Sequence, residues 1–214
     1  MRPESTLFYD VDTQKDFMLP DGKLYVPGAE RILPQLEKLT VFARQQGVAI
    51  AGSVDRHMPS DPELRANGGE YPEHCMNGTE GQKKVAATAP LHPLWVENRV
   101  YAEAELQSLL AREGEVYIEK QRFDVFTGNQ NAARVFDVLL HGKKDVVVYG
   151  VVTEVCVDHA ITGLKDRSVR LHVPIDAIAA LSAERSRETL EKWRSWGVRL
   201  TTVAEVVEEL RRNA

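Results

Sequence analysis

The 214-residue sequence lacks the features that mark several special classes of protein. Its only cysteines are Cys75 and Cys156, too few for a disulfide framework, so the chain suits a reducing compartment such as the cytoplasm. No apolar run approaches the length that spans a membrane, and the N-terminus lacks the charged-then-apolar layout of a signal peptide. The formal net charge of −5 argues against nucleic acid as a partner, because such binding needs a basic face. We therefore expect a cytoplasmic protein with no membrane and no nucleic-acid partner.

The sequence also has no linker rich in Pro, Gly or Ser, no low-complexity stretch and no internal repeat. Residues 1–214 are therefore expected to form a single domain, and a hydrophobic content of 43% supplies one substantial core. The alternation of strand-type and helix-type segments predicts a three-layer α/β/α fold of Rossmann-like type, with a six-stranded, mainly parallel sheet. Strands are predicted at about 6–12, 48–54, 115–120, 145–151, 169–175 and 198–202. Helices are predicted at about 29–46, 103–112, 129–141, 153–167, 182–195 and 203–212.

The segment from about 29 to 46 has the apolar spacing of an amphipathic helix. Gly47 follows it, and a glycine at this position is typical of a helix C-terminus. The loop from about 55 to 93 is too long for a plain connection, so we predict that it is functional. The predicted inner face of the helix carries Ile32, Leu33, Leu36, Leu39 and Phe42.

The string from Gly150 to Val157 places a cysteine where a buried strand gives way to a helix. The run 145–152 is rich in β-branched residues, and Thr153 is predicted to cap the helix that follows. Cys156 would then lie in the first helical turn, where the helix dipole and free backbone N–H groups favour the thiolate. The segment predicts a nucleophile, although a small buried core cysteine fits the same residues equally well.

Other polar residues also follow predicted strands or lie in the loops after them. These residues are Asp12, Asp55, His57, His74 and Lys120. Ligands in open α/β sheets bind beyond the carboxyl ends of the strands, so we expect these groups to converge at one edge. Asp55, His57 and His74 supply one carboxylate and two imidazoles, a set that suits one divalent transition metal, zinc first and iron or manganese as alternatives. Taken singly, each residue also fits a capping aspartate, a surface histidine or a solvated lysine.

Together these segments resemble the isochorismatase-like cysteine hydrolases, and within that family the nicotinamidases. The resemblance covers nearly the whole chain. Each motif alone is weak evidence, but five in the right order predict an isochorismatase-like fold and a related chemistry. The motifs are Asp12-Thr13-Gln14-Lys15-Asp16-Phe17 (D-x-Q-x-D-F), Asp55-Arg56-His57 (D-x-H), His74-Cys75 with Gly78-Thr79, Lys120, and the string from Gly150 to Val157 (G-V-x-T-E-x-C-V).

The resemblance implies a catalytic triad of Cys156, Asp12 and Lys120. Cys156 would attack an amide carbonyl, and Asp12 would take the thiol proton and pass it to the leaving amine. Lys120 would hold Asp12 in place and favour the thiolate. The resemblance further implies an oxyanion hole formed by the backbone N–H groups of Val152 and Cys156, with a cis peptide bond between Val151 and Val152.

For the substrate, the resemblance implies a small amide. In nicotinamidases a metal ion binds the pyridine nitrogen, and aromatic side chains sandwich the ring. Phe17 and Tyr71 fall at those aromatic positions, and Val155 is expected in the same wall. Tyr71 replaces a frequent tryptophan, Val155 a frequent aromatic, and Arg56 the aromatic often found between two of the metal ligands. These departures bear on the substrate and not on the type of reaction.

We therefore expect a metal-containing cysteine amidohydrolase that converts nicotinamide to nicotinate and ammonia through a thioester. As is usual in the family, we expect a homo-oligomer, either a dimer or a tetramer. An amidase acting on ureido or carbamoyl compounds is the first alternative, although such members often lack the metal set. Isochorismatase activity itself is disfavoured, because those enzymes lack the nucleophilic cysteine. The alternative from another class is a non-catalytic small-molecule or metal-binding module, but a pure binder has no need of the whole triad.

Overall fold

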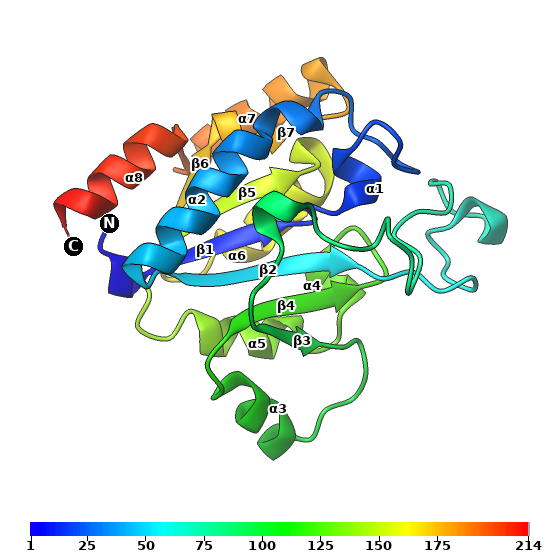
Figure 1. The fold of residues 1–214 in the computed structure, drawn as a ribbon, viewed down its shortest axis with the longest axis horizontal. Helices are drawn as coiled ribbons and strands as arrows, with labels where there is room; N and C mark the ends of the chain where they lie inside the picture. Colours follow the sequence, from blue (N-terminus) through cyan, green and yellow to red (C-terminus); the bar gives the residue numbers. More distant parts are fainter. Residues whose placement is uncertain (214) are drawn as a thin grey trace.

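A parallel β-sheet forms the centre of the computed structural model, which describes residues 1–213 (Figure 1). The strand order is β3-β4-β2-β1-β5-β6-β8, and β7 pairs with β5 outside this row. Each of these pairings is parallel. The strands are β1 (Thr6–Val11), β2 (Ala49–Asp55), β3 (Pro93–Val96), β4 (Glu115–Lys120), β5 (Asp145–Val151), β6 (Arg170–Pro174), β7 (Ile178–Ala179) and β8 (Arg199–Thr201).

Within residues 1–213 the sheet has eight strands, so the predicted number of six is wrong. The additional strands are β3 and β7, which span four and two residues. Runs this short carry no alternating pattern that would distinguish them from a loop. β3 begins at Pro93 and lies at the edge of the sheet, where the missing N–H of proline is tolerated.

Helices cover both faces of the sheet, which gives the three predicted layers (Figure 1). They are α1 (Lys15–Met18), α2 (Leu33–Gln46), α3 (Glu103–Leu110), α4 (Val125–Gly128), α5 (Ala132–Leu139), α6 (Asp158–Leu164), α7 (Ala183–Ser195) and α8 (Val203–Arg212). α2 and α8 pack together on one face, and α4, α5 and α6 lie on the other. The indole N–H of Trp193 in α7 donates to Asp158 in α6 at 2.8 Å. None of the helices in residues 1–213 has both the length and the apolar character needed to cross a membrane.

α2 confirms the predicted amphipathic helix, although the first predicted turn, Ala29–Ile32, is a 3₁₀ helix. Leu36, Leu39 and Phe42 are buried in the hydrophobic core, as their spacing predicts. Gly47 ends the helix with a φ of +66°, and its N–H donates to the carbonyl of Ala43.

The central strands β1, β2 and β5 are buried almost throughout, as expected for a parallel sheet covered on both faces. Val11 in β1 lies opposite Ser53 in β2 on one side and Gly150 in β5 on the other. Asp55 lies opposite Lys120 where β2 pairs with β4. The carboxyl ends of four adjacent strands therefore meet at one edge, and the residues that follow them share that edge.

Gly150 allows β5 to approach β1 closely at this edge. Its φ is +117°, which residues with side chains rarely adopt. A Cβ at this position would lie 2.0 Å from the carbonyl oxygen of Val11. Gly150 is the first residue of the motif that contains Cys156, and its close contact with β1 fixes the position at which the chain leaves β5.

Candidate active site

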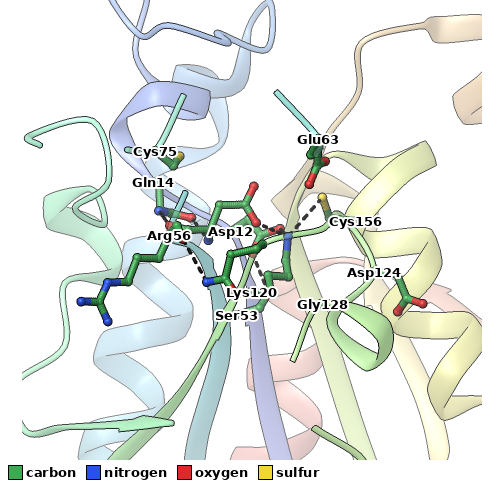
Figure 2. A network of polar contacts seen from close by, with 12 residues as sticks. Asp12, Gln14, Ser53, Arg56, Glu63, Cys75, Lys120, Asp124, Gly128 and Cys156 are labelled. Carbon is green, nitrogen blue, oxygen red and sulfur yellow. Dashed lines mark hydrogen bonds and ion pairs between the residues drawn. The ribbon is translucent and has the colours of Figure 1, made fainter. Parts of the chain in front are cut away.

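The predicted triad residues meet at the carboxyl edge of the sheet (Figure 2). Asp12 follows β1, Lys120 ends β4, and Cys156 lies in the turn after β5. The Lys120 ammonium lies 2.9 Å from Asp12 Oδ2 and 3.8 Å from Cys156 Sγ, and all three side chains are buried. The arrangement places a proton acceptor and a cation beside one thiol.

Asp12 has a left-handed backbone conformation, with a φ of +51°. Its backbone N–H donates to the Ser53 carbonyl at 3.2 Å, and the Ser53 hydroxyl donates to Asp12 Oδ1 at 2.7 Å. Oδ2 is thereby left to face Lys120 and the thiol. Sequence reasoning missed Ser53, because a serine within a buried strand gives no sign of the residue that it will face across the sheet.

Burial dominates the protonation of this site. It raises the pKa of the Cys156 thiol well above its usual value, and the Lys120 ammonium offsets this only in part. Burial also raises the pKa of the Asp12 carboxyl, again against the opposing effect of Lys120. Burial disfavours the Lys120 ammonium, but the carboxylates of Asp12 and Asp55 outweigh it and raise its pKa. Burial therefore favours the protonated thiol and opposes the effect expected of the helix dipole, so a neighbouring base is needed to form the thiolate.

The turn that carries Cys156 differs from the predicted start of a helix. Thr153–Val157 forms one π-helical turn before α6. Thr153 is not a cap, because its hydroxyl donates to the carbonyl of Ala179 at 2.9 Å. β7, which contains Ala179, pairs with the end of β5 and so competes for this hydroxyl. The peptide bond between Val151 and Val152 is cis, as the resemblance implies.

Asp55, His57 and His74 form a buried cluster whose potential ligand atoms lie within 4.8 Å of one another. Asp55 Oδ2 is 3.8 Å from His57 Nε2 and 3.6 Å from His74 Nε2. The other ring nitrogen of His57, Nδ1, lies 3.1 Å from Asp61 Oδ2. His74 Nδ1 lies 2.7 Å from the carbonyl oxygen of Pro72. Partners of this kind fix the tautomer that presents Nε2 to a metal, so the geometry fits the predicted ligand set.

Glu63, from the long loop after β2, lies beside the same cluster. Its Oε2 is 3.9 Å from His57 Nε2, and among the described residues neither atom has a hydrogen-bond partner. Burial raises the pKa of Glu63 to about 6, and the charge of Asp55 adds to this. Buried polar atoms without partners are costly, so this pair fits a site that receives a cation. Sequence reasoning missed Glu63, whose only signal was the length of its loop.

Asp55 belongs to both halves of the site. Its Oδ1 pairs with the Lys120 ammonium, while its Oδ2 faces the two histidines. Burial raises the pKa of Asp55, but Lys120 and the histidines outweigh burial and hold it well below its usual range. The triad and the candidate metal cluster therefore form one polar network, joined through Lys120 and Asp55.

The network opens on an inner cavity of about 20 Å³. This volume holds roughly one water molecule, so a substrate ring must displace side chains from the walls. An outer cavity of about 310 Å³ adjoins it and shares Glu63 and Phe123. The predicted residues that line the inner cavity are Phe17, Asp55, Tyr71, His74, Val152, Val155 and Cys156, and those that sequence reasoning missed are Leu24, Glu63, Phe123 and Leu181.

Arg56 points away from these cavities (Figure 2). Its guanidinium donates to both carboxylate oxygens of Glu119, at 2.7 and 2.9 Å, and to the side-chain oxygen of Asn77 at 2.9 Å. Among the residues that line these two cavities Arg56 is absent, so it would not contact a substrate bound there. Successive residues of an extended segment point to opposite sides, and Asp55 and His57 therefore face the site while Arg56 does not.

The fold is shared with known proteins. A family model described as the isochorismatase domain matches residues 7–205. A Bacillus subtilis (strain 168) protein, described as the uncharacterized isochorismatase family protein PncA, is 26% identical over 179 residues, which cover 81% of this chain and 86% of that protein. The zinc complex of the pyrazinamidase of Pyrococcus horikoshii has a TM-score of 0.73 and 24% identity, over 92% of this chain and 99% of that one. The N-carbamoylsarcosine amidase of Thermoplasma acidophilum has a TM-score of 0.68 and 22% identity, over 95% and 97%.

Proposed function

Because the chain belongs to the isochorismatase family of hydrolases, we propose that it is a metal-containing cysteine amidohydrolase that releases ammonia from nicotinamide. The observation that carries this proposal is the contact of Lys120 with both Asp12 and Cys156, beside a buried metal-type cluster. A thiol next to a carboxylate and an ammonium supports acyl transfer. The cluster on the wall of the same cavity supports a substrate with a ring nitrogen.

In the first half of the reaction, Asp12 Oδ2 accepts the thiol proton of Cys156, and the thiolate attacks the amide carbonyl carbon. The backbone N–H groups of Val152 and Cys156 receive the negative oxygen that forms. Collapse of the tetrahedral intermediate breaks the C–N bond, and Asp12 returns its proton to the nitrogen, so that ammonia leaves. The raised pKa of Asp12 suits a group that must both take and give this proton.

In the second half, a water molecule hydrolyses the thioester. Asp12 takes a proton from the water, and the water oxygen attacks the carbonyl carbon. The C–S bond then breaks. The proton passes from Asp12 to the Cys156 sulfur, which restores the thiol and releases the carboxylic acid. Lys120 keeps its charge throughout and holds Asp12 within reach of the sulfur.

Asp55, His57 and His74 would hold one divalent metal ion, zinc first and iron or manganese as alternatives, and Glu63 would supply a fourth donor. When bound, the metal supplies a Lewis-acidic partner for the pyridine nitrogen of the substrate. The unpartnered Oε2 of Glu63 and Nε2 of His57 support this assignment, because both point into the cluster without another partner among the described residues.

Phe17 and Tyr71 would orient the pyridine ring. Their rings lie 5.4 and 6.1 Å from the ring of His74, and both line the inner cavity. Aromatic contact of this kind supplies area and orientation without hydrogen bonds.

A ureido or carbamoyl amidase is the second candidate. The inner cavity of about 20 Å³ favours a narrow, linear head group over a ring. Val155 in the cavity wall is also smaller than the aromatic residue that the nicotinamidase pattern places there. The triad chemistry would be unchanged, and only the group that enters the cavity would differ.

We also propose that the enzyme works in the cytoplasm as a homo-oligomer, either a dimer or a tetramer. Cys75 and Cys156 are both free thiols, which supports a reducing compartment. Light scattering coupled to size-exclusion chromatography measures the oligomeric state directly, and a monomer at micromolar concentration would contradict this part of the proposal.

The test compares kcat/KM for nicotinamide, pyrazinamide, benzamide and N-carbamoylglycine by ammonia release at equal metal loading. Nicotinamide and pyrazinamide should both be hydrolysed, because each has a ring nitrogen meta to the carbon that bears the amide. Benzamide should be poorer by roughly a thousandfold or more, since the metal and the polar groups of the site would lose their partner. Cys156→Ala should lower turnover by roughly 10⁵-fold or more and keep the metal content of the wild type.

Three outcomes would contradict parts of the proposal. Hydrolysis of benzamide as fast as that of nicotinamide would show that no metal binds the ring nitrogen of the substrate. Activity on N-carbamoylglycine alone would establish the second candidate. Near-normal ammonia release by Cys156→Ala would exclude Cys156 as the nucleophile.

A further inference from the structure

The segment after β1 contacts the backbone of both segments that carry the candidate metal ligands, the end of β2 and the loop that follows it. Gln14 and Asp16 belong to this segment, and both are buried, yet neither takes part in the chemistry described above. Gln14 contacts the backbone of Asp55, and Asp16 contacts the backbone of Cys75, the residue after His74. The D-x-Q-x-D-F motif therefore reaches the metal cluster at two separate points.

Gln14 forms a two-bond ring with the backbone of Asp55. Its Oε1 accepts from the Asp55 N–H at 2.6 Å, and its Nε2 donates to the Asp55 carbonyl at 2.7 Å. The amide also donates to the carbonyl of Gln82 at 2.7 Å. Because the Gln14 side chain is fully buried, bulk water cannot replace these bonds. Gln14 thus fixes the end of β2, from which the Asp55 carboxylate reaches Lys120 and the histidines.

Asp16 binds the backbone next to His74, another of the candidate metal ligands. Its Oδ2 accepts from the Cys75 N–H at 2.6 Å, and its Oδ1 accepts from the Lys23 N–H at 3.0 Å. Cys75 has a φ of +46°, a conformation that costs free energy in a residue with a side chain and that the surroundings must impose. A Cβ on Gly81 would lie 2.2 Å from Asp16 Oδ2, so the loop encloses this carboxylate tightly. Asp16 thus fixes the chain beside His74.

We propose that Gln14 and Asp16 are positioning residues that set the spacing of the metal ligands, Gln14 through Asp55 and Asp16 through the backbone beside His74. The inference rests on the metal site of the proposed function. The two residues differ in one respect, because Asp55 also pairs with Lys120, which contacts the Cys156 thiol. Loss of the Gln14 bonds should therefore disturb the positions of both the metal ligands and Lys120 beside the thiol, whereas loss of the Asp16 bonds should disturb the metal ligands alone.

The experiment compares Gln14→Ala and Asp16→Ala with the wild type. Zinc affinity is measured by competition with a chromophoric chelator, and the alkylation rate of Cys156 by iodoacetamide is measured by mass spectrometry on zinc-stripped protein. Both variants should bind zinc roughly 10- to 100-fold more weakly. Only Gln14→Ala should change the alkylation rate of Cys156, by threefold or more, while Asp16→Ala alkylates at the wild-type rate.

Val147→Ala is the control for destabilisation, because Val147 is a fully buried core residue in the middle of β5, opposite Phe8 in β1. Gln14→Met fills the space of the glutamine without its hydrogen bonds and gives the same comparison if the alanine variant does not fold. Zinc affinities of both variants equal to that of Val147→Ala would overturn the inference. An alkylation rate changed as much by Asp16→Ala as by Gln14→Ala would overturn the division of roles.

These readouts use zinc and iodoacetamide alone and require no amide substrate. Wild-type protein that binds zinc but hydrolyses none of the four amides would refute the substrate proposal and leave the positioning roles standing. Wild-type protein that binds no zinc would refute both.

Discussion

Two buried residues of the site, Lys120 and Asp55, each contact partners on two sides. Lys120 contacts Asp12 and Cys156 on one side and Asp55 on the other, and Asp55 contacts Lys120 with one oxygen and the histidines with the second. Removal of one partner of a buried ion pair leaves the other charge uncompensated, which costs about 3–5 kcal/mol. We therefore expect these positions to tolerate little change, in contrast to the exposed residues around the outer cavity.

Glu63 gives a prediction at the scale of the residue. Glu63→Gln should weaken zinc binding at least about tenfold, because the amide keeps the shape of the side chain but removes an anionic donor beside the cluster. Isothermal titration calorimetry measures the affinity. Glu70→Gln is the matched control, because Glu70 lies in the same loop and lines only the outer cavity, and it should bind zinc as the wild type does. Unchanged affinity in Glu63→Gln would remove Glu63 from the ligand set.

At the scale of the elements, α4 and α6 meet behind the site. α4 follows the loop that carries Phe123 of the inner cavity, and α6 follows the turn that carries Cys156. Gly163 in α6 allows the ring of Phe126 from α4 to approach, and a Cβ on Gly163 would lie 2.0 Å from a carbon of that ring. The ring of Phe126 also stacks on Phe136, with centroids 5.0 Å apart. The glycine is therefore required for close packing of the two helices that follow the segments lining the inner cavity.

Gly163→Ala should destabilise the protein although alanine is the better helix former. The gain in helix propensity is about 1 kcal/mol. Overpacking against a ring that Phe136 holds in place costs about 1–3 kcal/mol. The net loss, measured by urea unfolding, should reverse in a Phe126→Ala background, where the ring is absent and Gly163→Ala should stabilise. A stabilised Gly163→Ala in the wild-type background would show that the contact of α4 with α6 is loose.

At the scale of the whole molecule, the site occupies the carboxyl end of the sheet, and a separate charge cluster lies at the opposite end. Asp145 begins β5, and its carboxylate accepts two bonds from Arg170 at 2.8 Å and lies 2.7 Å from His172 Nε2. Burial raises the pKa of Asp145, but Arg170 and His172 outweigh burial and lower it. The N-terminus and the end of α8 lie near this end, where the Met1 amine pairs with Glu209 at 2.5 Å (Figure 1).

The lowered pKa of Asp145 predicts how the stability of the protein depends on pH. A carboxylate with a lowered pKa in the folded state contributes stability that is present above its unfolded pKa of about 3.9 and is lost as the pH falls through the folded value. Asp145→Asn should therefore cost about 1–3 kcal/mol at pH 7, or roughly 2–10 °C in Tm, and progressively less below about pH 4. Differential scanning calorimetry from pH 7 to about pH 3 follows the change.

Asp137→Asn is the control for this measurement. Asp137 is 68% exposed and pairs with Arg167, and an exposed ion pair contributes about 0–1 kcal/mol. Its Tm should therefore stay close to that of the wild type at every pH. A difference between Asp145→Asn and wild type that is as large at pH 3 as at pH 7 would contradict the role of the carboxylate charge.

The amino-acid sequence by itself determined the parallel α/β architecture and the meeting of the motif residues at one edge. Apolar, β-branched segments such as 145–151 form buried strands, and parallel strands end on the same side, so Asp12, Asp55, Lys120 and Cys156 must lie near one another. This follows from local pattern and chain direction, and no knowledge of individual contacts is needed.

Only the tertiary structure decided which further residues join the site and which leave it. Ser53 and Glu63 belong to the site because they contact Asp12 and His57, and no local pattern encodes these contacts. Arg56 does not belong to it, because Glu119 binds its guanidinium on the far side. The two-residue strand β7 forms only because it pairs with the end of β5. The Ala179 carbonyl in β7 accepts a hydrogen bond from the hydroxyl of Thr153, the residue predicted to cap the next helix. Such features depend on partners distant in the chain. Burial of the side chain, which raises the pKa of the Cys156 thiol, likewise comes from the tertiary structure and not from the position of the cysteine in the sequence.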